Sequence, residues 1–435
     1  MSEQPVLTTS KGARVAVVDG IRTPFIKKNT LFKEARAKDL GAMVANELLS
    51  RLAVPKDKIE QVVFGQVIQD PDIPNLSREI SLLLNMPKAQ SYTVSSSCPT
   101  GLQVLINLSN SILMGNAHYA LAGGADSLSN APIRLNSHLI QLFRDVMAAK
   151  SYEEKYRLLR QITWQDFKLQ ALNLKDPLTQ LSLSAVSEQM AQDFHLSRQE
   201  LDEYAARSHR LAYQAWQSGE LRQQVMVSFP PPYKDFVVSD NQIEKHIKPE
   251  FYQKFKPFNG KNYGTATDWN TSHSCDGAAA VLLMNEHTAK AEGLNILGYI
   301  RHYTMTANDV WKNMFVGVTY SIAKVLQNAN MRLSDLDLID IHETSAAQIL
   351  SNLKLIESET FARQHLNRSA AIGQIDMSKL NILGGSLAYG NPRAVSSLRL
   401  IIQSLYALKQ RGGGRSLIAS SGLGGIGGAM ILESE

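Results

Sequence analysis

The spacing of apolar residues predicts strands that alternate with helices. In the first part of the chain it predicts strands over Arg14 to Asp19, Gln61 to Val67 and Tyr119 to Ala122. It predicts helices over Leu40 to Leu52 and Leu102 to Met114. An alternation of this kind is typical of α/β folds.

Clusters rich in glycine separate these elements. Asp19-Gly20 and Gly123-Gly124-Ala125-Asp126 are predicted to end the first and third strands. Near the C-terminus, Gly422-Leu-Gly-Gly-Ile-Gly-Gly428 joins two apolar runs, Ser416 to Ser420 and Ala429 to Leu432. A dinucleotide-binding loop joins a strand to a helix, so we interpret this segment as a glycine-rich hairpin that lines a site.

A change of character from about Arg134 to Tyr263 indicates a segment inserted into the α/β core. The segment is rich in charged residues and contains Pro230-Pro231-Pro232. Within it, Arg134 to Lys168 carries seven Lys or Arg and four Asp or Glu residues on a helical pattern. A solvated helix face is the simpler interpretation, and a basic face for a membrane or a partner protein is the alternative.

The core pattern returns after Leu294 and repeats that of the first half. Ile59 to Gly65 and Leu336 to His342 share one pattern of apolar residues. Cys98-Pro99 and Asn391-Pro392 each precede a long helix with an apolar stripe. A duplicated α/β unit is the simplest account of both matches.

Composition narrows the classes of function. The chain has 435 residues, of which 44% are hydrophobic, and its wholly apolar runs are far shorter than the roughly 20 residues of a membrane-spanning helix. The formal net charge of +5 comes without long basic runs, so it fits small anionic ligands and does not suggest nucleic acid. Two cysteines are too few for a disulfide framework or a cysteine-built zinc site. Because no secretory signal is readable either, we expect a cytoplasmic protein without a metal.

Cys98 is the first candidate for chemistry. It directly precedes Pro99, a residue favoured in the first turn of a helix. A thiol at that position faces unpaired N–H groups and the positive helix end, which favour the nucleophilic thiolate. A small buried cysteine is the structural alternative. The other cysteine, Cys275, has no comparable helix start.

His342, Glu343 and Asn391 are further candidates. His342 and Glu343 follow the predicted apolar strand Leu336 to Ile341. They lie at its C-terminal end, where open α/β sheets place their ligand crevices. Asn391 follows the glycine-rich turn Gly384 to Gly390, which lets the backbone come close to a ligand.

Motifs in order along nearly the whole chain resemble the thiolase superfamily. The resemblance is closest to the thiolase (β) subunits of bacterial fatty-acid-oxidation complexes, which are 3-ketoacyl-CoA thiolases. The motifs are Arg22-Thr-Pro-Phe25, Ser-Cys98 at a helix start, Gly123-Gly-Ala-Asp126, Pro231-Pro-Tyr-Lys234, Asp276-Gly-Ala-Ala-Ala280, His342-Glu343, Gly384-Gly-Ser-Leu-Ala-Tyr-Gly390 and the final glycine-rich hairpin.

The resemblance implies a thiolase fold, a duplicated five-layered αβαβα core with an inserted loop domain. Residues 1–125 and 264–290 would form the N-terminal half, and residues 291–435 the C-terminal half. Residues 126–263 would form a loop domain that binds coenzyme A and contacts partners. The family also implies a homodimer or tetramer, and a hetero-complex with a hydratase/dehydrogenase α subunit.

Carried over position by position, the resemblance assigns roles to single residues. Cys98 matches the nucleophile that takes the acyl group as a thioester. His342, followed by Glu343, matches a residue that helps to bind the thioester oxygen. Ser272 matches a serine beside the pantetheine chain, and Leu183 stands at the loop-domain Met-Gly motif. Coenzyme A is then a co-substrate, and no tightly bound cofactor is expected.

Several positions depart from the family pattern. Asn391 stands where the family has the histidine of Gly-His-Pro, which activates the nucleophile. Ser421 replaces the second cysteine of the family, which moves the proton during condensation or thiolysis. A serine hydroxyl is a far weaker acid and base near neutral pH than a thiol. In the family, the pair His/Asn-Glu is followed by Ala-Phe, and here Thr344-Ser345 follows His342-Glu343 instead. Trp269 stands where the family usually has a small residue.

Cys98, His342 and Asn391 together match the Cys-His-Asn set of ketoacyl synthases and chalcone-synthase-like enzymes. Those relatives condense after malonyl groups lose carbon dioxide, so they need no second cysteine. Three functions stay open on the sequence. They are 3-ketoacyl-CoA thiolysis through Cys98, decarboxylative condensation, and a non-catalytic thiolase-like subunit.

Overall fold

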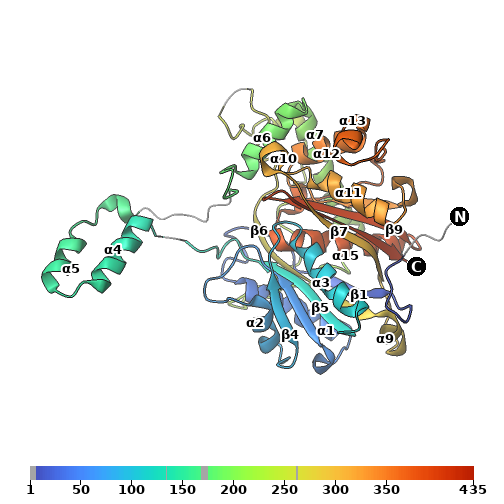
Figure 1. Ribbon diagram of the computed structural model, residues 1–435, viewed down its shortest axis with the longest axis horizontal. Coiled ribbons are helices and arrows are strands. Elements are labelled where there is room, and N and C mark those ends of the chain that lie inside the picture. The colour runs from blue at the N-terminus through green and yellow to red at the C-terminus, as the bar shows by residue number, and fades with distance from the viewer. Residues whose placement is uncertain (1–5, 134, 168–174, 261–262) are drawn as a thin grey trace.

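The computed structural model describes residues 6–133, 135–167, 175–260 and 263–435 (Figure 1). Its strands form one ten-stranded sheet in the order β4-β3-β5-β6-β1-β7-β10-β9-β8, and β2 pairs with β6. The strands are β1 (Val15–Arg22), β2 (Ile26–Lys27), β3 (Gln61–Gly65), β4 (Gln90–Val94), β5 (Tyr119–Asp126), β6 (Cys275–Asn285), β7 (Gly298–Ala307), β8 (Leu338–Ile341), β9 (Gly414–Gly422) and β10 (Ile426–Ser434).

The sheet consists of two halves with the same strand order. In the first half the order is β3-β5-β6-β1, and in the second it is β8-β9-β10-β7. In each half the first pair is parallel and the next two are antiparallel. The halves meet where Val15 to Val17 of β1 pair with β7. The duplication predicted from the sequence is therefore confirmed.

Helices cover both faces of each half and lie between the halves (Figure 1). The central layer contains α3 (Thr100–Leu113) and α15 (Ser396–Gln410), which touch each other and the strands on either side. The outer layers contain α1 (Ala37–Arg51) and α2 (Leu76–Leu83) on the first half, and α11 (Gly317–Asn328) and α12 (Ala346–Ile356) on the second.

Alternation along the strands explains these layers. Val15 and Val17 of β1 belong to the central core with α3 and α15. Ala16 and Val18 belong to the core under α1 and α2. Successive side chains of a strand point to opposite faces, so each half of the sheet buries two apolar surfaces. The result is the expected five-layered αβαβα arrangement.

The remaining helices lie in the insertion between β5 and β6 or connect the strands. Helices α6 and α7 pack against α12, on the outer face of the second half. The α-helices are α4 (Ser137–Ala148), α5 (Tyr152–Leu159), α6 (Leu183–Asp193), α7 (Arg198–Ser218), α8 (Pro249–Tyr252), α9 (Glu286–Ala291), α10 (Val310–Asn313), α13 (Glu359–His365) and α14 (Ser386–Tyr389). Short 3-10 helices are η1 (Lys56–Lys58), η2 (Trp164–Phe167), η3 (Leu333–Asp335) and η4 (Arg393–Val395).

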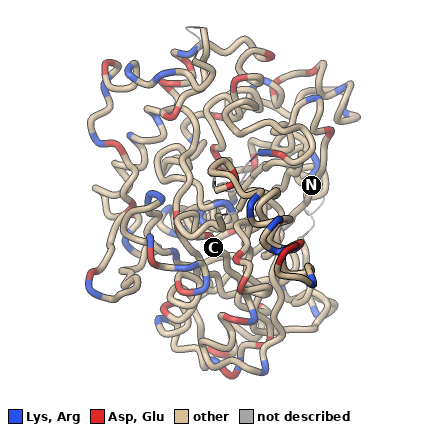
Figure 2. The backbone as a smooth tube through the Cα atoms, turned by 90° about the vertical axis from the view of Figure 1, so that its left-hand side faces the viewer, with Lys and Arg blue, Asp and Glu red and all other residues tan. Residues whose placement is uncertain are grey.

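Helices α4 and α5 form a hairpin that projects away from the body of the molecule (Figure 1). The helical pattern predicted between Arg134 and Lys168 is thus confirmed, although these two end residues lie outside the described ranges. Figure 2 views the molecule from that side, and basic and acidic positions are interspersed over the chain. In the described residues, no helix is both long and apolar enough to cross a membrane.

Two predicted strand ends are wrong. Strand β1 continues through Asp19-Gly20 to Arg22 with an irregularity after Val17, and β5 continues through its two glycines to Asp126. The glycines serve close packing and not a turn. A Cβ atom on Gly123 would lie 2.3 Å from the Phe64 ring, and one on Gly20 would lie 2.7 Å from Ile402. The C-terminal prediction holds, since β9 and β10 form an antiparallel hairpin.

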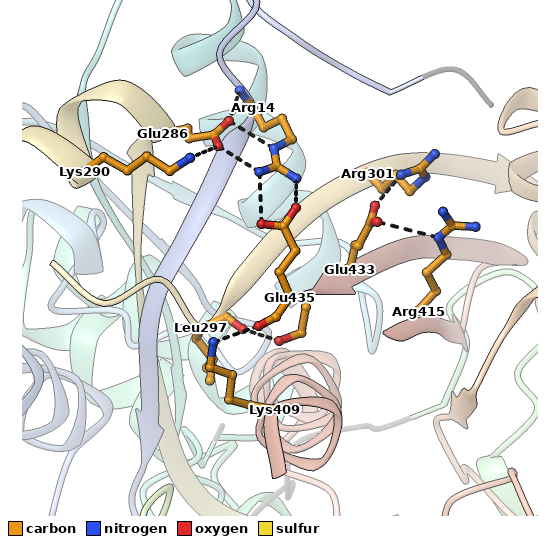
Figure 3. Close-up of polar contacts among 10 residues, drawn as sticks. Arg14, Glu286, Lys290, Leu297, Arg301, Lys409, Arg415, Glu433 and Glu435 are labelled. Carbon is orange, nitrogen blue, oxygen red and sulfur yellow. Dashed lines mark hydrogen bonds and ion pairs between the residues drawn. The ribbon is translucent and has the colours of Figure 1, made fainter. Parts of the chain in front are cut away.

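An ion-pair network holds the C-terminal residues against the start of β1 (Figure 3). Arg14 donates two hydrogen bonds to the Glu286 carboxylate, at 3.0 and 2.8 Å, and also pairs with Glu435. Lys290 pairs with the same Glu286 carboxylate at 2.8 Å. These contacts join the ends of the duplicated core, because Arg14 and Glu435 come from opposite ends of the chain.

Candidate active site

Cys98 lies immediately before the helix that separates the two sheet halves. Pro99 is the N-cap residue of α3, and the Cys98 side chain is buried between the halves. Ser97 takes a left-handed conformation with φ of 53°, which turns the chain sharply at the end of the loop after β4. Gly422 allows this turn to pack, since a Cβ atom there would lie 2.9 Å from the Cys98 nitrogen. The predicted helix-start position of the thiol is confirmed.

Asn391 brings the second half of the chain to this thiol. Its side-chain Nδ2 lies 3.8 Å from Cys98 Sγ and 3.4 Å from Ser272 Oγ. The amide oxygen accepts hydrogen bonds from the Arg393 backbone N–H and from the Ser396 hydroxyl, at 3.1 and 2.9 Å. Because both of those partners are donors, the orientation of the amide is fixed and its N–H groups face the thiol.

His342 follows β8 and is fully buried. Its Nδ1 lies 2.9 Å from the Ser386 hydroxyl, whereas its buried Nε2 has no hydrogen-bond partner in the described part of the chain. Burial, together with the positive charges of Arg399 and Arg393, lowers the pKa of His342 to about 3. The ring is therefore neutral near pH 7, and a Ser386 hydroxyl that donates to Nδ1 leaves the proton on Nε2.

Glu343 holds the surrounding loops together. Its fully buried carboxylate accepts hydrogen bonds from the Tyr204 and Ser208 hydroxyls of α7, at 3.2 and 2.7 Å. It also accepts one from Asn381 Nδ2 at 2.7 Å. Gly385 packs on the same carboxylate, where a Cβ atom would lie 2.1 Å from Oε2. Helix α7 and the loop from Asn381 to Gly385 are thus fixed around one carboxylate, which explains a glycine at the start of α14.

Ser272 and Ser421 lie at the edges of the same cluster. The Ser272 hydroxyl donates to the Thr344 carbonyl oxygen at 2.9 Å, which ties it to the His342 loop. The Ser421 hydroxyl lies on β9, next to Gly422, and donates to the Phe315 carbonyl oxygen at 3.3 Å. The backbone N–H of His342 donates to Ala419 of the same strand at 2.8 Å. The end of β9 therefore connects the His342 loop to the Cys98 turn.

Leu183, the coenzyme A-side residue predicted in the inserted segment, lies on a helix of that segment. Leu183 is the first residue of α6, which packs on α12. Among the described residues, no hydrogen bond joins it to Cys98, His342 or Asn391. The described residues also contain no group of three or more His, Cys, Asp or Glu side chains that could hold a metal ion.

Sequence reasoning missed residues that orient the predicted ones. Ser386 positions His342, and Ser396 positions Asn391. Ser386 lies in the glycine-rich turn that the sequence singled out, so this signal was present. Ser396 starts a helix five residues after Asn391, where a hydroxyl can reach back to the preceding turn.

Comparison with known families identifies this arrangement. The model described as "Thiolase, N-terminal domain" matches residues 15–287, and that described as "Thiolase, C-terminal domain" matches residues 294–434. The chain belongs to the thiolase family. The 3-ketoacyl-CoA thiolases of Pseudoalteromonas translucida and Shewanella frigidimarina are 44% and 43% identical to it, and each match covers the full length of both chains.

Solved thiolase structures have the same fold. Human mitochondrial 3-ketoacyl-CoA thiolase superposes with a TM-score of 0.81 at 27% identity, over 97% of this chain and 99% of the human one. A structure of the human enzyme in complex with CoA gives a TM-score of 0.81 at 26% identity and covers both chains fully. Acetyl-CoA acetyltransferase of Bacillus anthracis gives 0.82 at 26% identity, over 97% of this chain and 99% of that chain.

The thiolase site contains a thiol next to fixed hydrogen-bond donors. The Asn391 amide faces the sulfur, and the neutral His342 ring has an unpaired nitrogen. Such donors stabilise a thiolate and the oxyanion of a thioester carbonyl. Neither of these two side chains is a strong base, since His342 has a low pKa and the Asn391 amide does not titrate near neutral pH. The arrangement thus favours acyl transfer to sulfur more than proton transfer to carbon.

Proposed function

We propose that the chain is an acyltransferase of fatty-acid metabolism that acts on acyl-CoA thioesters, similar to 3-ketoacyl-CoA thiolases, with coenzyme A as co-substrate. The Cys98 thiolate attacks a carbonyl carbon, and the acyl group becomes a thioester of Cys98. Attack on the thioester carbon breaks its bond to the sulfur of coenzyme A, which takes up the proton lost by Cys98 and leaves as a thiol. Attack on the 3-keto carbon breaks the C2–C3 bond, and the C2 carbanion takes up that proton and leaves as acetyl-CoA. The observation that carries the proposal is the Asn391 amide fixed 3.8 Å from a thiol at a helix start. Asn391 Nδ2 and His342 Nε2 then donate to the carbonyl oxygen as it gains negative charge.

Other site residues take supporting roles in this proposal. Ser272, which contacts Asn391, lies beside the pantetheine chain. Glu343 acts as a positioning residue, since its carboxylate is fully engaged with α7 and Asn381. Leu183 and the rest of a loop domain over residues 126–263 face coenzyme A, between an N-terminal half of residues 1–125 and 264–290 and a C-terminal half of residues 291–435.

Ser421 favours decarboxylative condensation as a second candidate function. Thiolysis needs a group that protonates the departing carbanion and deprotonates the thiol of coenzyme A. The Ser421 hydroxyl is a weak acid and base, and it already donates to the Phe315 carbonyl oxygen. In decarboxylation the carbanion arises by loss of carbon dioxide and attacks the acyl group directly, so that proton transfer is not needed.

Intact-mass measurement tests the proposal. Incubation with acetyl-CoA or a longer acyl-CoA should add one acyl group to the protein, and Cys98→Ala should abolish the adduct. Cys275→Ala is a matched control, because Cys275 is buried and burial raises the pKa of its thiol. An adduct that persists in Cys98→Ala, or the absence of any adduct at every chain length, would remove Cys98 from the mechanism. The second outcome would favour a non-catalytic thiolase-like subunit.

A homodimer or tetramer accompanies this function in the proposal. Strand β4 is at the edge of the sheet and, in the described residues, pairs only with β3. An edge strand with free backbone groups is a template for a strand of a second copy. Tyr92 on this strand and Leu82 and Leu83 on the adjacent α2 are exposed apolar side chains. Sedimentation at micromolar concentration should show at least a dimer, and a stable monomer would contradict this.

The α4–α5 hairpin is the proposed contact for a hydratase/dehydrogenase α subunit or for a membrane surface of a cytoplasmic protein. Met147 of α4, Tyr152 of α5 and Trp164 of the adjoining η2 are 84%, 91% and 92% exposed, although they are large and apolar. Exposed apolar groups of this density mark interaction surfaces. A variant with a Gly-Ser linker in place of residues 136–167 should keep acylation but lose co-purification with the α subunit or with vesicles. Unchanged association of this variant with both would exclude the hairpin.

A further inference from the structure

Arg393 is a buried arginine beside the candidate active site. Its residue surface is 6% exposed, and it lies two positions after Asn391, at the start of η4. Its backbone N–H donates to the Asn391 amide oxygen at 3.1 Å. The backbone at Arg393 has a φ of 34°, an unusual left-handed conformation for a residue with a side chain. The same turn therefore fixes both Asn391 and Arg393.

The Arg393 guanidinium has no anionic partner within ion-pair distance in the part of the chain that the structure describes. No hydrogen bond of its side chain is found there, and its Nε is buried without a partner. Arg22 shows the ordinary solution, because this equally buried arginine pairs with both oxygens of Asp240 at 2.6 and 2.8 Å. Burial of a charge is unfavourable unless a counter-charge or hydrogen bonds compensate. Among the described residues, Arg393 has neither an ion pair nor a side-chain hydrogen bond, and its Nε is buried.

Asp126 is the nearby carboxylate, but it is already occupied by backbone groups. Its Oδ1 accepts hydrogen bonds from Val67 and Ile68, at 3.0 and 2.8 Å. Its Oδ2 accepts one from Ala394 at 2.9 Å. Asp126, at the end of β5, therefore fixes the loop after β3 and the η4 turn, and it does not form an ion pair with Arg393.

The charge of Arg393 reaches the reacting groups. After burial and Arg399, it is the next cause that lowers the pKa of His342. It also acts on Asp126 at the end of β5 and on Cys275 at the start of β6. Arg393 thus follows Asn391 on the same turn, its charge acts on His342, and no described carboxylate lies within ion-pair distance of its guanidinium.

We propose that Arg393 binds a carboxylate carried by the acyl group of the CoA thioester substrate. A guanidinium presents paired N–H donors that match a carboxylate in a bidentate contact. This assignment deepens the proposed acyltransferase function and rests on it. All substrates of this class are acyl-CoA thioesters whose acyl chain carries a carboxylate. The carboxylate lies close to the thioester in a malonyl group and far from it in an adipyl group.

Calorimetric binding to the Cys98→Ala protein separates recognition from acylation. The probes are matched in chain length, malonyl-CoA against propionyl-CoA and adipyl-CoA against hexanoyl-CoA, with coenzyme A alone as reference. We expect one carboxylated probe to bind about 10- to 100-fold more tightly than its match, as a charge-assisted contact provides. The pair that shows the preference gives the distance of the carboxylate from the thioester.

Arg393→Gln in the same background should abolish that preference and leave the affinity for coenzyme A unchanged. Arg363→Gln is the matched control, because the Arg363 side chain is 64% exposed on α13, where it pairs with Glu359 of the same helix and donates to the Ser369 carbonyl oxygen. Equal affinities within both matched pairs would overturn the inference, even if Arg393→Gln does not fold. An equal loss for carboxylated and plain probes in Arg393→Gln would also overturn it. Failure of every CoA compound to bind would overturn the proposed function as well.

Discussion

Asn391 points its side-chain Nδ2 at Cys98 Sγ across 3.8 Å, although 293 positions separate the two residues in the chain. Each residue precedes a proline and a helix of the central layer, one in each half of the duplicated core. The contact is therefore between equivalent turns of the two halves. Duplication of the fold has brought two copies of one helix start together at a single site.

The Asn391 amide should matter for its donors and not for its size. Asn391→Ala removes one donor from the thiolate and the oxyanion, so we expect Cys98 acylation to slow by about 10²- to 10³-fold. Asn391→Asp, which is nearly isosteric, should be at least as slow, because it places a negative charge beside the sulfur. Single-turnover acylation followed by mass spectrometry measures both rates. A rate for Asn391→Asp equal to that of the unmodified protein would contradict the assigned orientation.

His342 should act as a neutral hydrogen-bond donor. Burial and the charges of Arg399 and Arg393 hold its pKa at about 3, so it does not titrate between pH 5 and 8. We expect His342→Asn, which keeps an N–H donor, to acylate faster than His342→Ala. The pH profile of acylation should show no step near pH 6.5 that His342→Asn removes. Such a step, lost in the variant, would show that His342 works as a general base.

Thiolysis should be weak because the second acid/base group is a serine. General acid–base catalysis contributes about 10²- to 10⁴-fold, so 3-ketoacyl-CoA cleavage should be slower than in ordinary thiolases by about that factor. The double variant Asn391→His with Ser421→Cys should gain 3-ketoacyl-CoA cleavage. The unmodified chain should decarboxylate malonyl-CoA faster than this double variant does. Parallel assays of both reactions measure this.

The two assays also separate the remaining functions. Cleavage by the unmodified chain at ordinary thiolase rates would refute the argument from Ser421. If the unmodified chain catalyses neither reaction while the double variant cleaves, the natural chain is a non-catalytic relative with an intact scaffold.

The Arg14–Glu286 pair should stabilise the fold in a pH-dependent way (Figure 3). The hydrogen bonds from Arg14, with that from Lys290, hold the pKa of Glu286 well below its usual range near 4.5. A lowered pKa gives stability that is present above the unfolded value and declines as the pH falls below about 4.5. Arg14→Met should therefore lower the free energy of unfolding at pH 7 by about 1–2 kcal/mol, since Arg14 is partly exposed.

Denaturant unfolding at pH 7, 5 and 3 measures this effect. The difference between Arg14→Met and the unmodified chain should shrink toward pH 3. Arg363→Met is the control, because the Arg363–Glu359 pair is exposed and should contribute little at any pH. A difference that grows on acidification would contradict the assigned direction of the Glu286 pKa.

Much of the fold follows from local pattern. The period-two and helical spacings predicted β3, α3 and the β9–β10 hairpin, because each element buries its own periodic face. The matching motifs around Cys98-Pro99 and Asn391-Pro392 predicted the duplication. The errors came at Gly20 and Gly123, where the sequence signal of a turn is the same as that of close packing against Ile402 and Phe64.

The sequence by itself determined which side chains could act and which kinds of element carry Cys98 and His342. Cys98 at a helix start and His342 at a strand end were readable because helix and strand termini have local signatures. Tertiary structure alone decided that the Asn391 amide meets Cys98, that His342 is neutral, and that the buried Arg393 forms no ion pair within the described residues. These properties depend on how the two halves pack. The burial of each side chain, and the charges that act on it, come from many residues that are distant in the chain.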